Sequence, residues 1–158
     1  MIKFITSIND LSMTMKFEDE YHPNLRLSLE EKSEILSESY KAWLILDDNL
    51  VGETYGFPVI FPLLYKFEIP DLEWESSGSA LYCYSTTIVR GFQGKGLGSI
   101  LKAFWLGLLS DSLLTKVAGH AKVGSSSALN SKFGAKFKKV HPNWCDTNET
   151  YVFYEMEL

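Results

Sequence analysis

The alternation of apolar and polar positions predicts β-strands along most of the chain. It is clearest over residues 80–89, where successive side chains switch from one face of a strand to the other. Residues 40–46 and 50–63 are expected to form a hairpin, because the connection between them is short and polar. The second segment is one strand, or two strands broken at Pro58 and Pro62. The remaining expected strands are residues 3–6, 115–122, 135–141 and 150–158.

Apolar residues at helical spacing predict a long helix that follows Gly96 and ends near Asp111. Its apolar face consists of Leu97, Ile100, Leu101, Phe104, Trp105 and Leu108. Ser28 and Glu31 have the spacing of a capping box, which predicts a second helix through about Ser37. Shorter helices are expected from near Leu11 to a break at residues 22–24, and over residues 124–133.

Residues 65–79 are expected to form a polar loop that is unusually long for a compact domain. Its acidic residues are Glu68, Asp71, Glu73 and Glu75. Loops of this length are often functional, and a simple solvated excursion is the alternative.

The composition is that of a globular protein, and its 158 residues predict one domain, residues 1–158. A formal net charge of −5 argues against nucleic-acid binding, which needs a basic surface. The sequence shows neither a secretory signal nor an apolar run of about 18 residues, so we expect a cytoplasmic protein without membrane contact. Cys83 and Cys145 have no metal-binding spacing, so we expect two small buried residues and no metal site.

Three glycines at a spacing of two, Gly94, Gly96 and Gly98, separate the strand 80–89 from the long helix. They leave bare backbone N–H groups at a helix N-terminus, which is a favourable place for an anion. A P-loop would need Ser or Thr directly after Lys95, and a dinucleotide-binding turn would need a different glycine spacing.

The segment from Gln93 to Gly98 resembles the Gln/Arg-x-x-Gly-x-Gly/Ala signature of the GNAT acyltransferase superfamily. Residues 132–137 resemble the later Lys-x-Gly-Phe segment of that family, with Ala135 in place of the phenylalanine. The resemblance implies an α/β (α+β) GNAT fold, a mixed and largely antiparallel bent sheet flanked by helices, which splays beside its central strand. A glycine turn that only caps a core helix is the alternative.

The resemblance also implies that acetyl-CoA is the cosubstrate. Its pantetheine arm would pair with the backbone of Ile88, Val89 and Arg90. Its pyrophosphate would lie on the backbone of Gln93, Gly94, Lys95, Gly96, Leu97, Gly98 and Ser99. Lys132 would lie near the adenosine 3′-phosphate, or would be an ordinary surface lysine, and Asn130 would hydrogen-bond the cosubstrate.

The catalytic residues are less well defined, because two positions depart from the family pattern. Tyr82 stands where the family sometimes has a glutamate base, so Tyr82, Glu53 and His120 are the catalytic candidates. Glu53 could instead be an exposed hairpin residue, and His120 a hydrogen-bonded strand histidine. Asn130 stands where the family commonly has a tyrosine acid, which leaves Tyr84, Tyr82, Tyr154 or water for that role.

The function predicted from the resemblance is N-acetyl transfer from acetyl-CoA to a primary amine by direct attack. The acceptor is an unidentified small molecule or protein. The alternative is a catalytically degenerate CoA-binding module for regulation or protein interaction. A monomer and a homodimer are both open, and the last strand, residues 151–158, is apolar enough to pair across a dimer.

Overall fold

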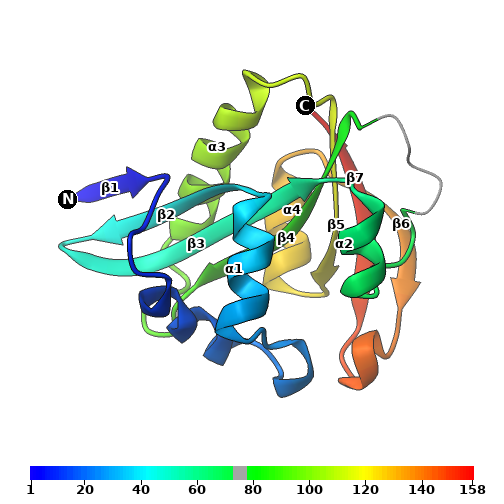
Figure 1. The fold of residues 1–158 in the computed structure, drawn as a ribbon, viewed down its shortest axis with the longest axis horizontal. Helices are drawn as coiled ribbons and strands as arrows, with labels where there is room; N and C mark the ends of the chain where they lie inside the picture. The colour runs from blue at the N-terminus through cyan, green and yellow to red at the C-terminus, as the bar shows by residue number, and fades with distance from the viewer. Residues whose placement is uncertain (73–77) are drawn as a thin grey trace.

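The computed structural model describes residues 1–72 and 78–158, and a seven-stranded sheet runs through the molecule (Figure 1). The strands are β1 (Ile2–Ile5), β2 (Tyr40–Leu46), β3 (Asn49–Pro58), β4 (Ala80–Ile88), β5 (Lys116–Lys122), β6 (Lys136–His141) and β7 (Tyr151–Glu157). Their order across the sheet is β1-β2-β3-β4-β5-β7-β6. Among the strands of the described residues, β4 and β5 are the one parallel pair, which confirms the mixed and largely antiparallel sheet.

Helices cover both faces of this sheet. The helices α1 (Leu29–Ser37) and α2 (Phe61–Lys66) lie on one face, and α3 (Leu97–Ser110) and α4 (Ser125–Lys132) lie on the other (Figure 1). Short 3₁₀ helices cover Leu11–Glu20, Pro23–Leu25 and Trp144–Asp146. Each face has its own hydrophobic core, with Trp43 fully buried on the α1 side and Trp105 on the α3 side. The predicted core position of Trp105 is therefore confirmed.

The prediction that residues 50–63 are entirely extended is wrong at its end. The strand β3 stops at Pro58, and α2 begins at Phe61 with Pro62 in its first turn. Proline has no N–H to donate to a sheet and a φ angle suited to the first turn of a helix. The expected loop 65–79 loses its first residues to α2, and Glu73 and Glu75 lie outside the described residues.

Two further expectations are corrected by the fold. The strand β7 lies between β5 and β6, so its backbone is already paired on both sides and cannot pair across a dimer. The edge strand β6 carries exposed lysines, which discourage edge-to-edge pairing.

The two cysteines differ in exposure. Cys83 is buried as expected, whereas Cys145 is exposed, because it lies in a tight surface turn with a φ of 50°.

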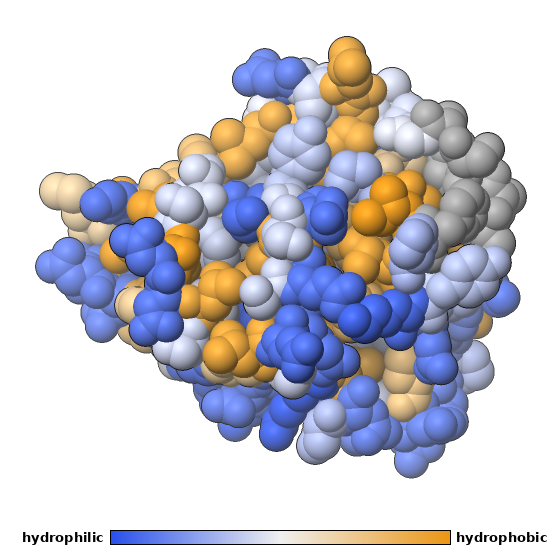
Figure 2. All heavy atoms as spheres, viewed as in Figure 1, coloured by the Kyte–Doolittle hydropathy of each residue, from blue (hydrophilic) through white to orange (hydrophobic). Residues whose placement is uncertain are grey.

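The outer surface on the α1 and α2 side has hydrophilic residues interspersed with hydrophobic ones (Figure 2). None of the helices in the described part of the chain is long and apolar enough to cross a membrane.

Candidate active site

The strands β4 and β5 diverge halfway along their length, as expected for a splayed sheet. Their pairing ends at Cys83 and Gly119, whereas β4 continues to Ile88 and β5 to Lys122. The divergence opens a cleft of about 560 Å³, lined by both strands, by the first turns of α3 and by α4. This volume is in the range of small-molecule and cofactor pockets.

The glycine-rich turn forms one end of this cleft. Gly94 and Gly96 have φ angles of 76° and 78°, in the left-handed region that glycine adopts without steric cost. Gly96 precedes α3, and no side chain of the described residues caps the helix there. The carbonyl of Gly96 accepts a hydrogen bond from the N–H of Ile100, which begins the helical pattern. The uncapped first turn and the helix dipole therefore offer an anion site at this end of the cleft.

The expected cosubstrate-binding residues divide into two groups. The residues that line the cleft are Ile88, Gln93, Gly94, Gly96, Gly98, Ser99 and Asn130. Those outside the described lining are Val89, Arg90, Lys95 and Leu97. Leu97 is buried in the α3 core, and the Lys95 ammonium lies over the ring of Phe92. Their roles in binding stay predictions.

The backbone around Arg90 already has hydrogen-bond partners within the protein. Gln93 donates from Nε2 to the carbonyl of Ile88 at 2.8 Å, which ties the glycine turn to the end of β4. The N–H of Val89 bonds to the carbonyl of Val51, and the N–H of Arg90 donates to Glu20 Oε2 at 3.1 Å. A ligand that uses the Arg90 amide must therefore displace the Glu20 carboxylate.

Asn130 presents an unsatisfied acceptor in the cleft. Its Nδ2 donates to the carbonyl of Ser126 at 2.9 Å, but its buried Oδ1 has no hydrogen-bond partner among residues 1–72 and 78–158. A buried acceptor without a partner costs free energy, so a ligand with an N–H or O–H group at this point would be favoured. Nearby, Lys132 lies with its Nζ 3.4 Å from Ser99 Oγ, and its side chain is exposed.

Tyr82 and His120 meet at the point where β4 and β5 separate. The hydroxyl of Tyr82 lies 2.8 Å from His120 Nδ1, and His120 Nε2 lies 2.8 Å from Asp71 Oδ2. Tyr82 and His120 both line the cleft, and both side chains are almost completely buried. The order of the three groups is that of a proton relay in which a carboxylate orients an imidazole.

The ionisation of these groups fixes the direction of the hydrogen bonds. Burial lowers the pKa of His120 to about 4, against the opposing effect of Asp71. Partial burial works against ionisation of Asp71, but hydrogen bonds from His120 and His141 hold its pKa below the usual value. His120 is therefore neutral at pH 7, donates from Nε2 to the Asp71 carboxylate and accepts at Nδ1 from the Tyr82 hydroxyl. Burial raises the pKa of Tyr82 well above 10, so this hydroxyl keeps its proton.

Asp71 also contacts two basic side chains of β6. His141 Nε2 lies 2.7 Å from Asp71 Oδ2, and the Lys139 ammonium lies 3.3 Å from Asp71 Oδ1. The ligand atoms of Asp71, His120 and His141 all lie within 4.8 Å of one another, a spacing that a divalent cation can also bridge. The adjacent ammonium disfavours a second cation there, so the hydrogen-bonded relay is the better interpretation of this cluster.

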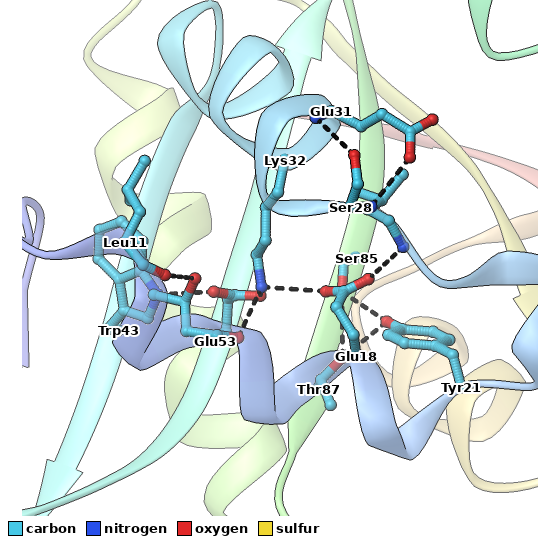
Figure 3. A network of polar contacts seen from close by, with 12 residues as sticks. Leu11, Glu18, Tyr21, Ser28, Glu31, Lys32, Trp43, Glu53, Ser85 and Thr87 are labelled. Carbon is cyan, nitrogen blue, oxygen red and sulfur yellow. Dashed lines mark hydrogen bonds and ion pairs between the residues drawn. The ribbon is translucent and has the colours of Figure 1, made fainter.

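Glu53 is not among the described residues that line the cleft, and it belongs to a buried ionic network (Figure 3). Its Oε2 accepts a hydrogen bond from Trp43 Nε1 at 2.8 Å, and its Oε1 lies 2.8 Å from the ammonium of Lys32. Lys32 also bonds to Glu18 Oε2 at 3.0 Å, and Glu18 Oε1 accepts from the N–H of Leu27. The network therefore joins the N-terminal segment, α1 and β3.

The expectation that Glu53 is an exposed hairpin residue, if it is not catalytic, is wrong. Glu53 is 1% exposed and stands opposite Trp43 in the middle of the β2–β3 pairing. Burial raises the pKa of Glu53 to about 7, although Lys32 works in the opposite direction. One ammonium faces two carboxylates here, so a proton on Glu53 relieves an uncompensated buried charge. Its catalytic role stays a prediction, and its position favours a structural one.

Sequence reasoning missed the third member of the relay. Asp71 lies in the long acidic segment before β4, where its spacing from His120 carries no signal. Asp71 has a positive φ angle of 75°, and its carboxylate contacts His120 of β5. Only the length of the loop pointed to a function there.

Comparisons with known proteins agree on the fold. No protein-family model and no curated protein sequence matches the chain. Among solved structures, the loading GNATL domain of CurA from Lyngbya majuscula is 18% identical, with a TM-score of 0.76 over 99% of this chain and 98% of that chain. The GphF GNAT-like decarboxylase, in complex with isobutyryl-CoA, is 17% identical, with a TM-score of 0.77 over 98% of both chains.

A GNAT family acetyltransferase from Elizabethkingia anophelis, solved with acetyl-CoA bound, is 14% identical. Its TM-score is 0.72, over 99% of this chain and 98% of that chain. The chain therefore has the GNAT fold, as the glycine signature predicts.

Proposed function

We propose that this protein is an acyltransferase that moves an acetyl group from acetyl-CoA to a primary amine. The observation that carries the proposal is one continuous cleft. It joins the uncapped N-terminus of α3, which suits a pyrophosphate, to Tyr82 and His120, which suit proton transfer. The acetyl-CoA bound to the acetyltransferase from Elizabethkingia anophelis supports the choice of cosubstrate.

In this proposal acetyl-CoA lies along the splay between β4 and β5. Its pyrophosphate takes the N–H groups of the turn from Gln93 to Ser99, where the glycines let the backbone approach closely. Its amide-bearing arm runs beside Ile88 and gives the orphaned Oδ1 of Asn130 a donor. The thioester then reaches the point where the two strands separate.

The amine attacks the thioester carbonyl directly, and Tyr82 and His120 receive its proton. As the C–N bond forms, the amine proton passes to the Tyr82 oxygen, and the Tyr82 hydroxyl proton passes to His120 Nδ1. Asp71 stabilises the imidazolium that results, as the carboxylate of a catalytic triad does. Collapse of the tetrahedral intermediate breaks the C–S bond and releases CoA.

The second candidate function is a CoA-binding module without turnover. It is favoured by one observation, the asparagine at position 130 where the family commonly has a tyrosine acid. This module would bind acetyl-CoA in the same cleft and would regulate a partner protein.

An acceptor screen separates the two functions. The measurement is the release of free CoA thiol from acetyl-CoA, with and without each member of a panel of primary amines and peptides with free N-termini. Amine-dependent release, with acetyl-amine found by mass spectrometry, supports the enzyme. Binding of acetyl-CoA without release in the presence of any amine would favour the module.

A further inference from the structure

Cys83 and Lys102 form a polar pair on the α3 face of β4. The ammonium of Lys102 lies 3.2 Å from Cys83 Sγ, and the two residues are 0% and 6% exposed, respectively. Both residues line the cleft, although the proton relay described above does not use them. Cys83 immediately follows Tyr82 in the strand, so the pair lies on the opposite face of the sheet from the relay.

Lys102 has an unusual environment for a buried cation. None of the ion pairs formed within residues 1–72 and 78–158 involves Lys102, and its ammonium lies 5.1 Å from the centre of the Trp105 ring. Buried ammonium groups normally pair with a carboxylate, because their desolvation is costly. A negative charge that develops in the cleft beside Lys102 would therefore be stabilised.

The Cys83–Lys102 pair lies at the vertex of the cleft, which is the point where the pairing of β4 with β5 ends. Cys83 is the last β4 residue that pairs with β5, opposite Gly119. A side chain at Gly119 would lie 2.6 Å from the Tyr154 hydroxyl, so the glycine leaves room for this tyrosine. Lys102 also belongs to the second turn of α3, the helix whose first turn is the proposed pyrophosphate site. The proposed pyrophosphate site and the Lys102 ammonium are thus one turn apart on the same helix.

We propose that Lys102 is the catalytic group that stabilises and protonates the departing CoA thiolate. This inference rests on the proposed function. When the C–S bond breaks, the sulfur keeps the electron pair and takes a proton from the Lys102 ammonium, which leaves CoA thiol and a neutral amine. The proton left on His120 then passes through solvent to the neutral Lys102 amine, which restores both groups. An anion that forms beside a preorganised cation is stabilised without further reorganisation.

Cys83 is a positioning residue in this proposal. Its sulfur accepts a hydrogen bond from Lys102 and holds the ammonium at the vertex. Asn130 cannot donate a proton to a thiolate as a tyrosine can, so the Lys102 ammonium fills the role left open at that position.

The test compares acetyl-CoA with acetyl-seleno-CoA as cosubstrates for the wild type and Lys102→Met. A selenolate is a much weaker base than a thiolate and leaves without a proton. With acetyl-CoA we expect kcat to fall about 100-fold or more in the variant. With acetyl-seleno-CoA, kcat of the variant should be close to that of the wild type. The affinity for acetyl-CoA, measured by calorimetry, should be the same in the wild type and in Lys102→Met.

Three controls make the result specific. Lys138→Met removes an exposed lysine of β6 and should leave both rates unchanged. Cys83→Ser keeps an acceptor for Lys102 and should retain activity, whereas Cys83→Ala should lose activity with acetyl-CoA more than with the selenoester. Thermal unfolding should show that Lys102→Met is folded, since it replaces a buried charge by an apolar side chain of similar length.

Each outcome bears on the proposal. An equal loss of kcat with both cosubstrates would mean that Lys102 only supports the fold, and it would leave the proposed function intact. Full activity of Lys102→Met with acetyl-CoA would also overturn the catalytic role of Lys102 and leave the proposed function intact. If the wild type binds no acetyl-CoA, both the proposed function and this inference are overturned.

Discussion

Tyr82 on β4 and His120 on β5 share a hydrogen bond of 2.8 Å at the point where the two parallel strands separate. Neither residue lies in a loop, so their relative position is fixed by the sheet. Asp71 reaches the same imidazole from a segment 49 residues away and completes the relay. Two strands therefore hold the base of the proposed mechanism, and the segment before β4 supplies the carboxylate that orients it.

Tyr82→Phe should lower kcat for acetyl transfer by about 100-fold, because it removes the hydroxyl that passes the amine proton to His120. Binding of acetyl-CoA should be unchanged, since the proposed pyrophosphate site is at the other end of the cleft. Tyr65→Phe is the matched control, as Tyr65 is 77% exposed on α2. Equal activity of Tyr82→Phe and Tyr65→Phe would remove Tyr82 from the mechanism.

His120 should make folding stability depend on pH in the acid range. Its pKa is about 4 in the folded protein and 6.5 in a solvated histidine, so the unfolded chain binds more protons between these values. Stability is therefore fully present above pH 6.5 and decreases as the pH falls toward 4, by about 3 kcal/mol in total. Relative to the wild type, His120→Gln should lose this dependence in urea titrations between pH 4 and 7. Parallel curves for the two proteins would contradict the burial of a neutral His120.

Glu53 should make folding stability depend on pH in the opposite direction from His120. Its pKa is about 7 when folded and 4.5 in solvent, so the folded state binds more protons in this window. Its contribution is present below pH 4.5 and decreases by about 3 kcal/mol as the pH rises through 7. Glu53→Gln keeps the shape of the side chain and should remove the loss, while acetyl transfer continues. A large fall in kcat with a normal stability profile would instead support the catalytic role predicted for Glu53.

The strand and helix patterns predicted the architecture well because burial on a sheet or helix face imposes a regular period. The glycine spacing from Gly94 to Gly98 likewise predicted the fold, since a left-handed turn before a helix has few solutions. The prediction failed at residues 61–63, where an apolar run fits a strand and a helix equally well and Pro62 decides for the helix.

The candidate site could be predicted only in part. Tyr82 and His120 are visible as unusual residues on strands, but their contact depends on which strands are neighbours. Asp71, Lys102 and Lys32 have partners far away in the chain, and no local pattern marks a side chain that pairs across the fold. Glu53 was misplaced for the same reason: a glutamate just after a hairpin glycine looks exposed unless its partner, Lys32, is known.

The central claim is that the N-terminus of α3 binds the pyrophosphate of acetyl-CoA. Gly98→Asp tests it, because Gly98 lines the cleft in the first turn and has a helical backbone. An aspartate there stabilises the helix through its dipole but repels a phosphate. Gly107→Asp introduces the same charge on the same helix, at an exposed position with open space around it.

The most direct measurement is calorimetric titration of the wild type, Gly98→Asp and Gly107→Asp with acetyl-CoA and with desulfo-CoA. We predict binding of both ligands by the wild type and by Gly107→Asp, and at least a roughly tenfold weaker affinity in Gly98→Asp, which corresponds to about 1.4 kcal/mol. Absence of binding to the wild type, or equal affinity in all three proteins, would show that the glycine turn is only the start of a helix and would contradict the account.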